Sequence, residues 1–285
     1  MRKRPITAED LFKIQFVNGP QMSPDGKRVL FIKTHIDAEK NKYVGNLFTV
    51  EVASGEVKQW TQGEKPGGMG RWSPDGSQMA FVSGREGPSA QIYLLPSDGG
   101  EARKLTNLPE GSIGDIVWSP DGKHIAVTFR PLAENRTTKA EKERKEKNGS
   151  PPPWEIETLW YRLDGDGYFG QQRYAVYMVD AVTGEHRKFY DKDKLGFYSF
   201  DWTPDSKALV IAHSVHRTEP MLKKPNDQIF VVPLKGKVKM IPGLAKGPKG
   251  NVAVSPDGKH VAFEGDHVAE EVWGMRNTRL YVSPM

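Results

Sequence analysis

The sequence predicts an all-β protein made of repeated four-stranded sheets, because one turn motif recurs along the chain with similar strands around it. The motif Ser-Pro-Asp-Gly begins at Ser23, Ser73, Ser119 and Ser255, and the variant Thr-Pro-Asp-Ser begins at Thr203. Apart from the third interval, successive copies start about 50 residues apart, which is the length of one β-propeller blade. The chain has 29 Gly and 21 Pro, in keeping with many tight turns. We therefore expect a β-propeller of about five repeats.

Each motif is predicted to form a hairpin turn between two strands. In the second copy, proline presets φ at the first corner, aspartate tolerates the second, and Gly76 supplies a positive φ. Residues 79–82 follow and are apolar on both faces, which predicts a strand covered on both sides by neighbouring blades. The matching strands in the other copies are residues 29–31, 125–127, 209–211 and 261–263.

A third strand is expected in every repeat, followed by a glycine turn and a polar outer strand in the first four. The third strands are residues 47–50, 92–95, 176–179, 229–232 and 280–282. Residues 103–106 illustrate an outer strand, whose polarity suits a position facing solvent. The fifth repeat reaches Met285 before such a turn, so we expect its blade to be incomplete.

These elements predict a helical arm at residues 1–17 and a partial propeller at residues 18–285. The blades are expected at about residues 18–64, 65–108, 109–194, 195–243 and 244–285. In the arm, Thr7 to Asp10 resembles a helix capping box, with Leu11, Phe12 and Ile14 as an apolar face behind it.

The long third interval holds an insertion at residues 131–172. Its charged run, Lys139 to Lys147, alternates in sign and predicts a solvated loop. Residues 154–162, with two tryptophans and alternating apolar positions, predict an additional strand, and residues 164–167 predict a turn.

Composition limits the partners and the compartment. The net charge of +5 comes from 41 basic and 36 acidic residues that are scattered, which argues against a nucleic-acid partner. The chain has no cysteine, so disulfides and thiolate zinc sites are excluded. No stretch approaches the roughly 20 apolar residues of a membrane span, and no apolar core follows the basic start. We therefore expect a cytoplasmic protein without a membrane partner.

The sequence offers no candidate catalytic residue, no metal site and no cofactor site. A Gly-x-Ser-x-Gly elbow is missing from it, so the histidines have no serine nucleophile to activate. His213 and His216 would need a third donor to bind a metal, and we interpret them as a surface pair. The motif aspartates lie about one blade apart and are interpreted as turn formers, and the turn at residues 164–167 lacks the downstream glutamate of a calcium loop.

One acidic pair, Glu270 and Glu271, is the only candidate for substrate binding. Two adjacent carboxylates on a blade loop have the charge needed to hold the free α-ammonium of a peptide. The alternative is an ordinary solvated loop at residues 266–276.

Several segments resemble acylaminoacyl-peptidase-like members of the prolyl oligopeptidase family. The resemblance is carried by residues 153–169 with Arg173 and residues 177–180, by residues 7–11, and by residues 216–219 and 225–232. It implies a propeller, usually of seven blades, that covers a C-terminal α/β-hydrolase domain and admits short or unfolded peptides. The chain matches about the first five blades, so no catalytic residue is carried over. The resemblance also implies that the N-terminal helix packs on a hydrolase domain.

The predicted function is therefore the substrate-gating portion of a serine peptidase for short peptides, which is not catalytic as this isolated chain. The implied partners are peptides in the propeller channel and a hydrolase domain or subunit. The alternative is a non-enzymatic interaction propeller of the TolB-like or WD-repeat-like kind, because Ser-Pro-Asp-Gly turns are shared with such proteins.

Overall fold

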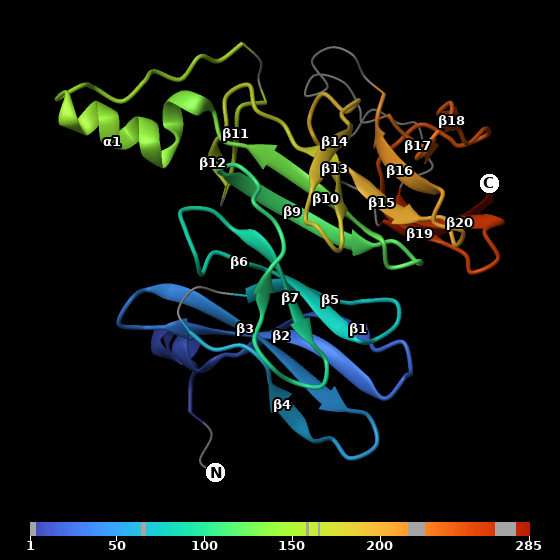
Figure 1. Ribbon diagram of the computed structural model, residues 1–285, viewed down its shortest axis with the longest axis horizontal. Coiled ribbons are helices and arrows are strands. Elements are labelled where there is room, and N and C mark those ends of the chain that lie inside the picture. The colour runs from blue at the N-terminus through green and yellow to red at the C-terminus, as the bar shows by residue number, and fades with distance from the viewer. Residues whose placement is uncertain (1–3, 64–66, 158–159, 165, 216–225, 266–277) are drawn as a thin grey trace. The chain divides into compact units, whose positions relative to one another are not determined.

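The computed structural model shows a β-propeller fold built of antiparallel sheets, as the sequence predicts (Figure 1). It describes residues 4–63, 67–157, 160–164, 166–215, 226–265 and 278–285. The chain forms two compact units, one of Met1–Leu108 with Val182–Gly184 and one of Pro109–Ala181 with Glu185–Met285. None of the helices in these described ranges is long and apolar enough to cross a membrane.

The first unit holds two four-stranded sheets, preceded by the short 3-10 helix η1 (Ala8–Lys13). The strands of its first sheet are β1 (Phe16–Met22), β2 (Arg28–Asp37), β3 (Lys42–Glu51) and β4 (Val57–Gln59). Those of its second sheet are β5 (Gly67–Trp72), β6 (Gln78–Ser83), β7 (Gln91–Pro96) and β8 (Arg103–Lys104). Each sheet runs in sequence order from an inner to an outer strand.

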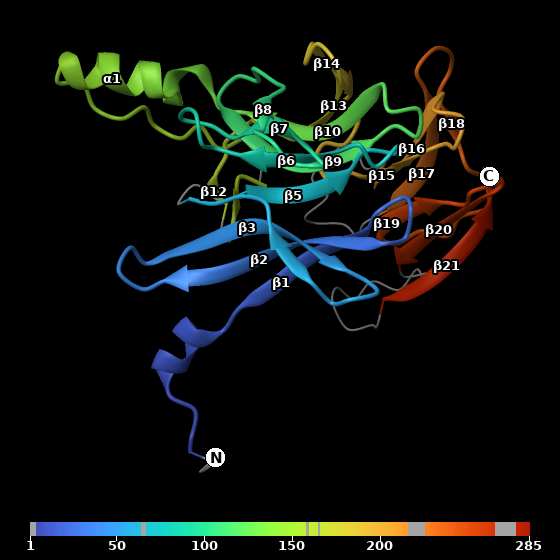
Figure 2. The ribbon, with the colours of Figure 1, turned by 60° about the horizontal axis from the view of Figure 1, so that its bottom comes forward.

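The second unit holds two four-stranded sheets, one three-stranded sheet and a two-stranded sheet in the insertion. The strands of the three-stranded sheet, labelled β19, β20 and β21, lie side by side in Figure 2. The strands of its first sheet are β9 (Gly111–Trp118), β10 (His124–Pro131), β13 (Ala175–Asp180) and β14 (His186–Tyr190). Those of the second are β15 (Ser199–Trp202), β16 (Ala208–Ser214), β17 (Asp227–Pro233) and β18 (Lys239–Met240). Those of the third are β19 (Lys249–Val254), β20 (His260–Gly265) and β21 (Arg279–Pro284).

The recurring motif closes the first hairpin of each of the five blade sheets, and its aspartate is a turn former as predicted. In the first copy, the Ser23 hydroxyl donates to Asp25 Oδ1 at 2.6 Å, and the same carboxylate oxygen accepts from the Lys27 amide at 3.1 Å. Ser23 Oγ in turn accepts from the Arg28 amide at 2.9 Å. The glycine of this copy has φ of +72°, a conformation that suits glycine. The hydroxyl-to-aspartate bond is 2.6–2.7 Å in all five copies.

The variant motif replaces glycine by Ser206, which keeps the left-handed conformation with φ of +59°. Its hydroxyl oxygen accepts from the backbone amide of Asp121 in the preceding blade at 2.9 Å. Ser206 is buried, so this bond gives the serine a structural role that glycine cannot fill.

The core lies between neighbouring sheets, because the second strands are buried on both faces. In β6, for example, Met79, Ala80 and Phe81 are fully buried. Side chains of one inner strand also accept amide hydrogens of the next. Gln21 accepts from Trp72 at 2.7 Å, and Asp201 accepts from Val254 at 2.8 Å, at matching positions of two blade pairs.

The insertion differs from its predicted form in two respects. Residues of the charged run form helix α1 (Thr138–Glu146), where a solvated loop was predicted. Thr137 caps it by accepting from the Ala140 amide at 3.3 Å, and Lys145 pairs with Glu141 four residues earlier at 2.6 Å. Helix α1 buries no residue, so only the prediction of solvation was correct.

The prediction of one strand at residues 154–162 was also wrong for the residues of this segment that the structure describes. Strand β11 (Arg162–Leu163) pairs with β12 (Gly167–Tyr168) around the predicted turn, while Trp154 lies outside any strand. Its indole ring lies under the Arg136 guanidinium at 3.3 Å and stacks on Tyr168 at 5.6 Å between centroids. Stacking between an arginine and aromatic rings thus orders this segment. An alternating pattern of apolar residues fits both such stacking and strand pairing, so the pattern did not distinguish the two structures. The short 3-10 helix η2 (Glu134–Arg136) supplies the arginine.

Candidate functional site

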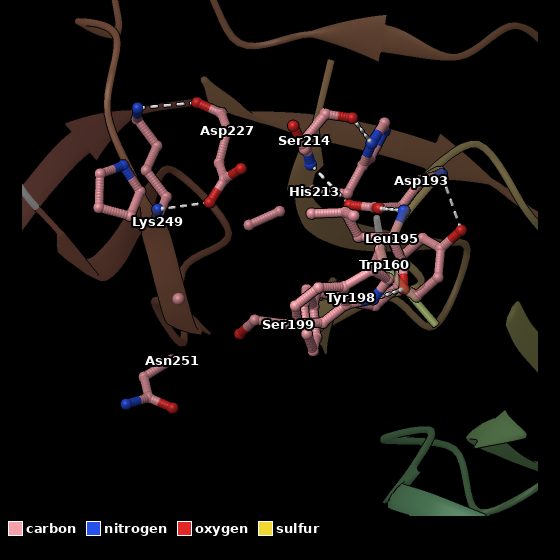
Figure 3. A pocket seen from close by; sticks show the side chains of 14 residues that line it. Trp160, Asp193, Leu195, Tyr198, Ser199, His213, Ser214, Asp227, Lys249 and Asn251 are labelled. Atoms are coloured by element: carbon pink, nitrogen blue, oxygen red, sulfur yellow. Dashed lines mark hydrogen bonds between the residues drawn. The ribbon is translucent and has the colours of Figure 1, made fainter. Parts of the chain in front are cut away.

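The second unit contains a pocket of about 490 Å³ at one end of strands β15, β16, β17 and β19 (Figure 3). Its walls come from the start of β15, the end of β16, the starts of β17 and β19, and the loop between β14 and β15. Trp160, from the insertion, completes the wall. A concave, largely apolar cavity of this size is typical of binding sites, which span about 300–1,000 Å³.

Asp193 organises the loop between β14 and β15. Its Oδ1 accepts from the amides of Leu195 at 2.6 Å and Gly196 at 2.9 Å, and its Oδ2 accepts from the Ser214 amide at 2.8 Å. Burial raises the pKa of Asp193, while these three amides act in the opposite direction. The carboxylate therefore joins the loop to the end of β16 and forms part of the pocket wall.

His213 is buried, whereas the sequence predicted a surface position. Its Nδ1 lies 2.8 Å from the Ser214 carbonyl oxygen, which only accepts, so this nitrogen carries the proton. Burial lowers the pKa of His213, so its neutral form is favoured and Nε2 accepts from the Tyr190 hydroxyl at 2.9 Å. Burial also raises the pKa of Tyr190 to about 12, which keeps that hydroxyl protonated. The imidazole stacks on Phe230 at 4.6 Å between centroids.

Lys249 is the buried cation of the pocket, with 6% of its surface exposed. Its Nζ donates to the carbonyl oxygens of Ala245, Asp227 and Gly247 at 2.6, 2.8 and 3.2 Å. Its backbone amide donates to Asp227 Oδ2 at 3.0 Å. Burial lowers the pKa of Lys249 and the Asp227 carboxylate raises it. The Lys249 ammonium and the Asp227 carboxylate are therefore both hydrogen-bonded to groups of the protein.

The substrate-binding pair predicted from the sequence cannot be compared with this pocket. Glu270, Glu271 and His216 fall outside the described residues, so the carboxylate pair stays a prediction. Among the described residues, no group of three metal-ligating side chains comes together. Sequence reasoning missed Asp193, three residues before Gly196, and Lys249, directly before Gly250; the signal available in each segment is a charged residue close to a glycine.

The folded-state pKa of His213 predicts a pH dependence of stability. Because that pKa is lowered, the unfolded chain takes up a proton near pH 6.5 while the folded chain does not. The contribution of this group is therefore present above about pH 6.5 and is lost as the pH falls below it. Urea unfolding from pH 7.5 to 5.5 should show a shallower decline for His213→Gln than for the unchanged protein, with at most about 1.4 kcal/mol per pH unit between them. Parallel curves would contradict this assignment.

The fold places the chain in the class of β-propellers. A family described as "PD40: TolB beta propeller domain" matches residues 9–148. In sequence and fold together, the chain resembles the N-terminal propeller part of acylaminoacyl-peptidase-like members of the prolyl oligopeptidase family.

Three relatives illustrate this resemblance. The "Uncharacterized peptidase YuxL" of Bacillus subtilis is 37% identical over 225 residues, which cover 79% of this chain and 33% of the relative. Dipeptidyl-peptidase 5 of Porphyromonas gingivalis is 27% identical over 267 residues, which cover 90% and 38% of the two chains. The structure of acylaminoacyl peptidase from Pyrococcus horikoshii has a TM-score of 0.71 at 17% identity, over 96% of this chain and 39% of that one. The chain thus spans a third to two fifths of the length of these proteins.

Proposed function

We propose that this chain is the substrate-gating propeller of a serine peptidase that cleaves short peptides, and that it is not catalytic by itself. The observation that carries the proposal is the 37% identity with a peptidase of which the chain spans 33%. A propeller that covers an active site restricts access sterically, because a folded protein is wider than the channel between blades. The proposed partners are therefore short peptides and a hydrolase domain or subunit.

Exposed apolar side chains at η1 are evidence that another domain packs against it. Leu11, Phe12 and Ile14 are 46%, 45% and 46% exposed, although they are large and apolar. Such neighbouring apolar side chains are common where another domain packs. We propose that the hydrolase domain covers these side chains of η1 and its C-cap residue Ile14. A cytoplasmic location and the lack of a nucleic-acid or membrane partner stay predictions from the sequence.

The isolated chain should hydrolyse neither acyl-aminoacyl nor aminoacyl p-nitroanilides above the blank. The reason is that residues 1–285 contain no Gly-x-Ser-x-Gly elbow to present a nucleophile. The measurement is absorbance of released nitroaniline, with a serine peptidase as positive control. Turnover that co-purifies with the chain and is abolished by a serine-directed inhibitor would refute the assignment of a non-catalytic role.

A TolB-like interaction propeller is the second candidate, favoured by the description of the matching family. The coding sequence that follows the Met285 codon separates the two. Further Ser-Pro-Asp-Gly repeats and then Gly-x-Ser-x-Gly would support the peptidase. A stop codon, together with no hydrolase subunit in a pull-down, would favour the interaction propeller.

A further inference from the structure

The buried ionisable groups of the pocket are already engaged by the protein. Three amides bind the Asp193 carboxylate, three carbonyl oxygens take the three Nζ hydrogens of Lys249, and His213 is bonded at both ring nitrogens. The Asp227 carboxylate also offsets the charge of Lys249. A charged ligand would have to displace these bonds, so the pocket is complementary to an uncharged one.

One wall of the pocket is aromatic. The rings of Trp160 and Phe197 meet edge to face at 5.2 Å between centroids, beside Leu195 and Tyr198. The Trp160 indole donates to the Leu195 carbonyl oxygen at 3.2 Å, which fixes the orientation of its ring. Phe197 is 49% exposed despite its size. A ligand ring packed here would cover this surface and gain edge-to-face contacts.

Two polar groups at the pocket retain hydrogen-bonding capacity. Ser199 Oγ accepts from the Val252 amide at 2.8 Å, and Asn251 Nδ2 donates to Glu264 at 2.8 Å. Within the part of the chain that the structure describes, the Ser199 hydroxyl proton has no acceptor and Asn251 Oδ1 has no donor. In Figure 3 the Ser199 hydroxyl points away from Tyr198, toward the side where Lys249 and Asn251 lie. One donor and one acceptor are the complement of a peptide group.

We propose that this pocket binds an uncharged aromatic residue of a peptide, with its ring against Trp160 and Phe197 and its peptide group between Ser199 and Asn251. The proposal deepens the proposed function, on which it rests for the ligand being a peptide. It assigns a preference for aromatic side chains to the propeller itself.

Binding is measured on the full chain by titration while the indole N–H resonances are followed, with the Trp160 signal assigned through Trp160→Phe. The probes are the N-acetyl amides of phenylalanine, alanine and lysine. The phenylalanine amide should shift the Trp160 resonance and bind at least tenfold more tightly than the other two, because only its ring buries a large apolar surface. Benzyl alcohol, which lacks peptide groups, should bind more weakly than the phenylalanine amide.

A pocket-filling variant with a matched control tests the location. Gly250 lines the pocket, and a β-carbon added to it meets no atom within 4 Å. Gly68 has the same open space, and each glycine immediately precedes the bulge of its inner strand. Gly250→Phe should weaken binding of the phenylalanine amide at least tenfold, whereas Gly68→Phe should leave it unchanged.

The polar contact is tested with Asn251→Gly. Asn251 has φ of +47°, which glycine adopts without strain, so only the side chain is removed. Several-fold weaker binding of the phenylalanine amide, with benzyl alcohol unaffected, is expected.

Equal affinity for the alanine and phenylalanine amides, tighter binding of the lysine amide, or unchanged binding by Gly250→Phe would overturn the proposal. If Gly250→Phe does not fold, the probe series on the unchanged chain decides alone. Failure of the proposed function would appear in the coding sequence and the turnover assay, and neither outcome alters this binding measurement.

Discussion

Replacing Asp193 with alanine should lower the free energy of unfolding by about 4 kcal/mol, because three amides then lose their shared acceptor. Asp193 is only 4% exposed, so water replaces the carboxylate poorly. Asp193→Asn keeps one oxygen for Leu195 and Gly196 but turns an amide group toward Ser214. Asp193→Asn should therefore lower the free energy of unfolding by about half as much as Asp193→Ala. Urea unfolding at pH 7 measures both.

The neighbouring Asp191 provides the control. Its carboxylate is 47% exposed and lies 3.8 Å and 3.6 Å from the ammonium groups of Lys188 and Lys192. Exposed pairs of this kind contribute little, so Asp191→Ala should change the free energy of unfolding by less than about 0.5 kcal/mol. Similar losses for Asp191→Ala and Asp193→Ala would contradict the role assigned to the buried carboxylate.

Gly196→Ala should lower the free energy of unfolding by about 3 kcal/mol or more. Gly196 has φ of +80°, and an added β-carbon would lie 2.6 Å from the backbone nitrogen of Tyr174. The left-handed conformation costs about 1–2 kcal/mol for alanine, and the overlap with backbone forces the loop to move. Since the Gly196 amide donates to Asp193, that movement also weakens the pocket wall.

Gly243→Ala separates the cost of the left-handed conformation from the cost of the overlap with Tyr174. Gly243 has a similar φ of +77°, but a β-carbon added there meets no atom within 4 Å. Gly243→Ala should therefore lower the free energy of unfolding by about 1 kcal/mol, which is the cost of the left-handed conformation alone. If the two alanine variants lose equal stability, the close approach of Gly196 to Tyr174 has no energetic consequence.

The repeated sheets followed from the sequence because their signals are local. A hydroxyl residue and the aspartate two positions later make the same bonds in every copy of the turn, as at Ser73 and Asp75. The strands after each turn are apolar on both faces, and residues 79–82 are buried as that pattern predicts. Short-range spacing was therefore enough to predict the fold class.

The insertion shows where local signals were insufficient. A run that alternates in charge fits a solvated loop or a solvated helix equally well, and the cap at Thr137 with the Lys145–Glu141 pair favours the helix. Trp154 and Trp160 suggested strand alternation, whereas in the folded chain the Trp154 ring lies under the Arg136 guanidinium and stacks on Tyr168. That arginine lies 18 positions before Trp154 in the sequence, so no local pattern relates them.

The sequence by itself determined the repeated antiparallel sheets, the turn chemistry and the resemblance to peptidase propellers, since each depends on residues close together in the chain. Only the tertiary structure decided the pocket, because Trp160, Asp193, His213 and Lys249 come from separate segments and their burial exists only after the sheets pack. The same packing turned His213 from an expected surface residue into a buried neutral one. Burial and hydrogen bonding between distant segments set the chemistry of this site.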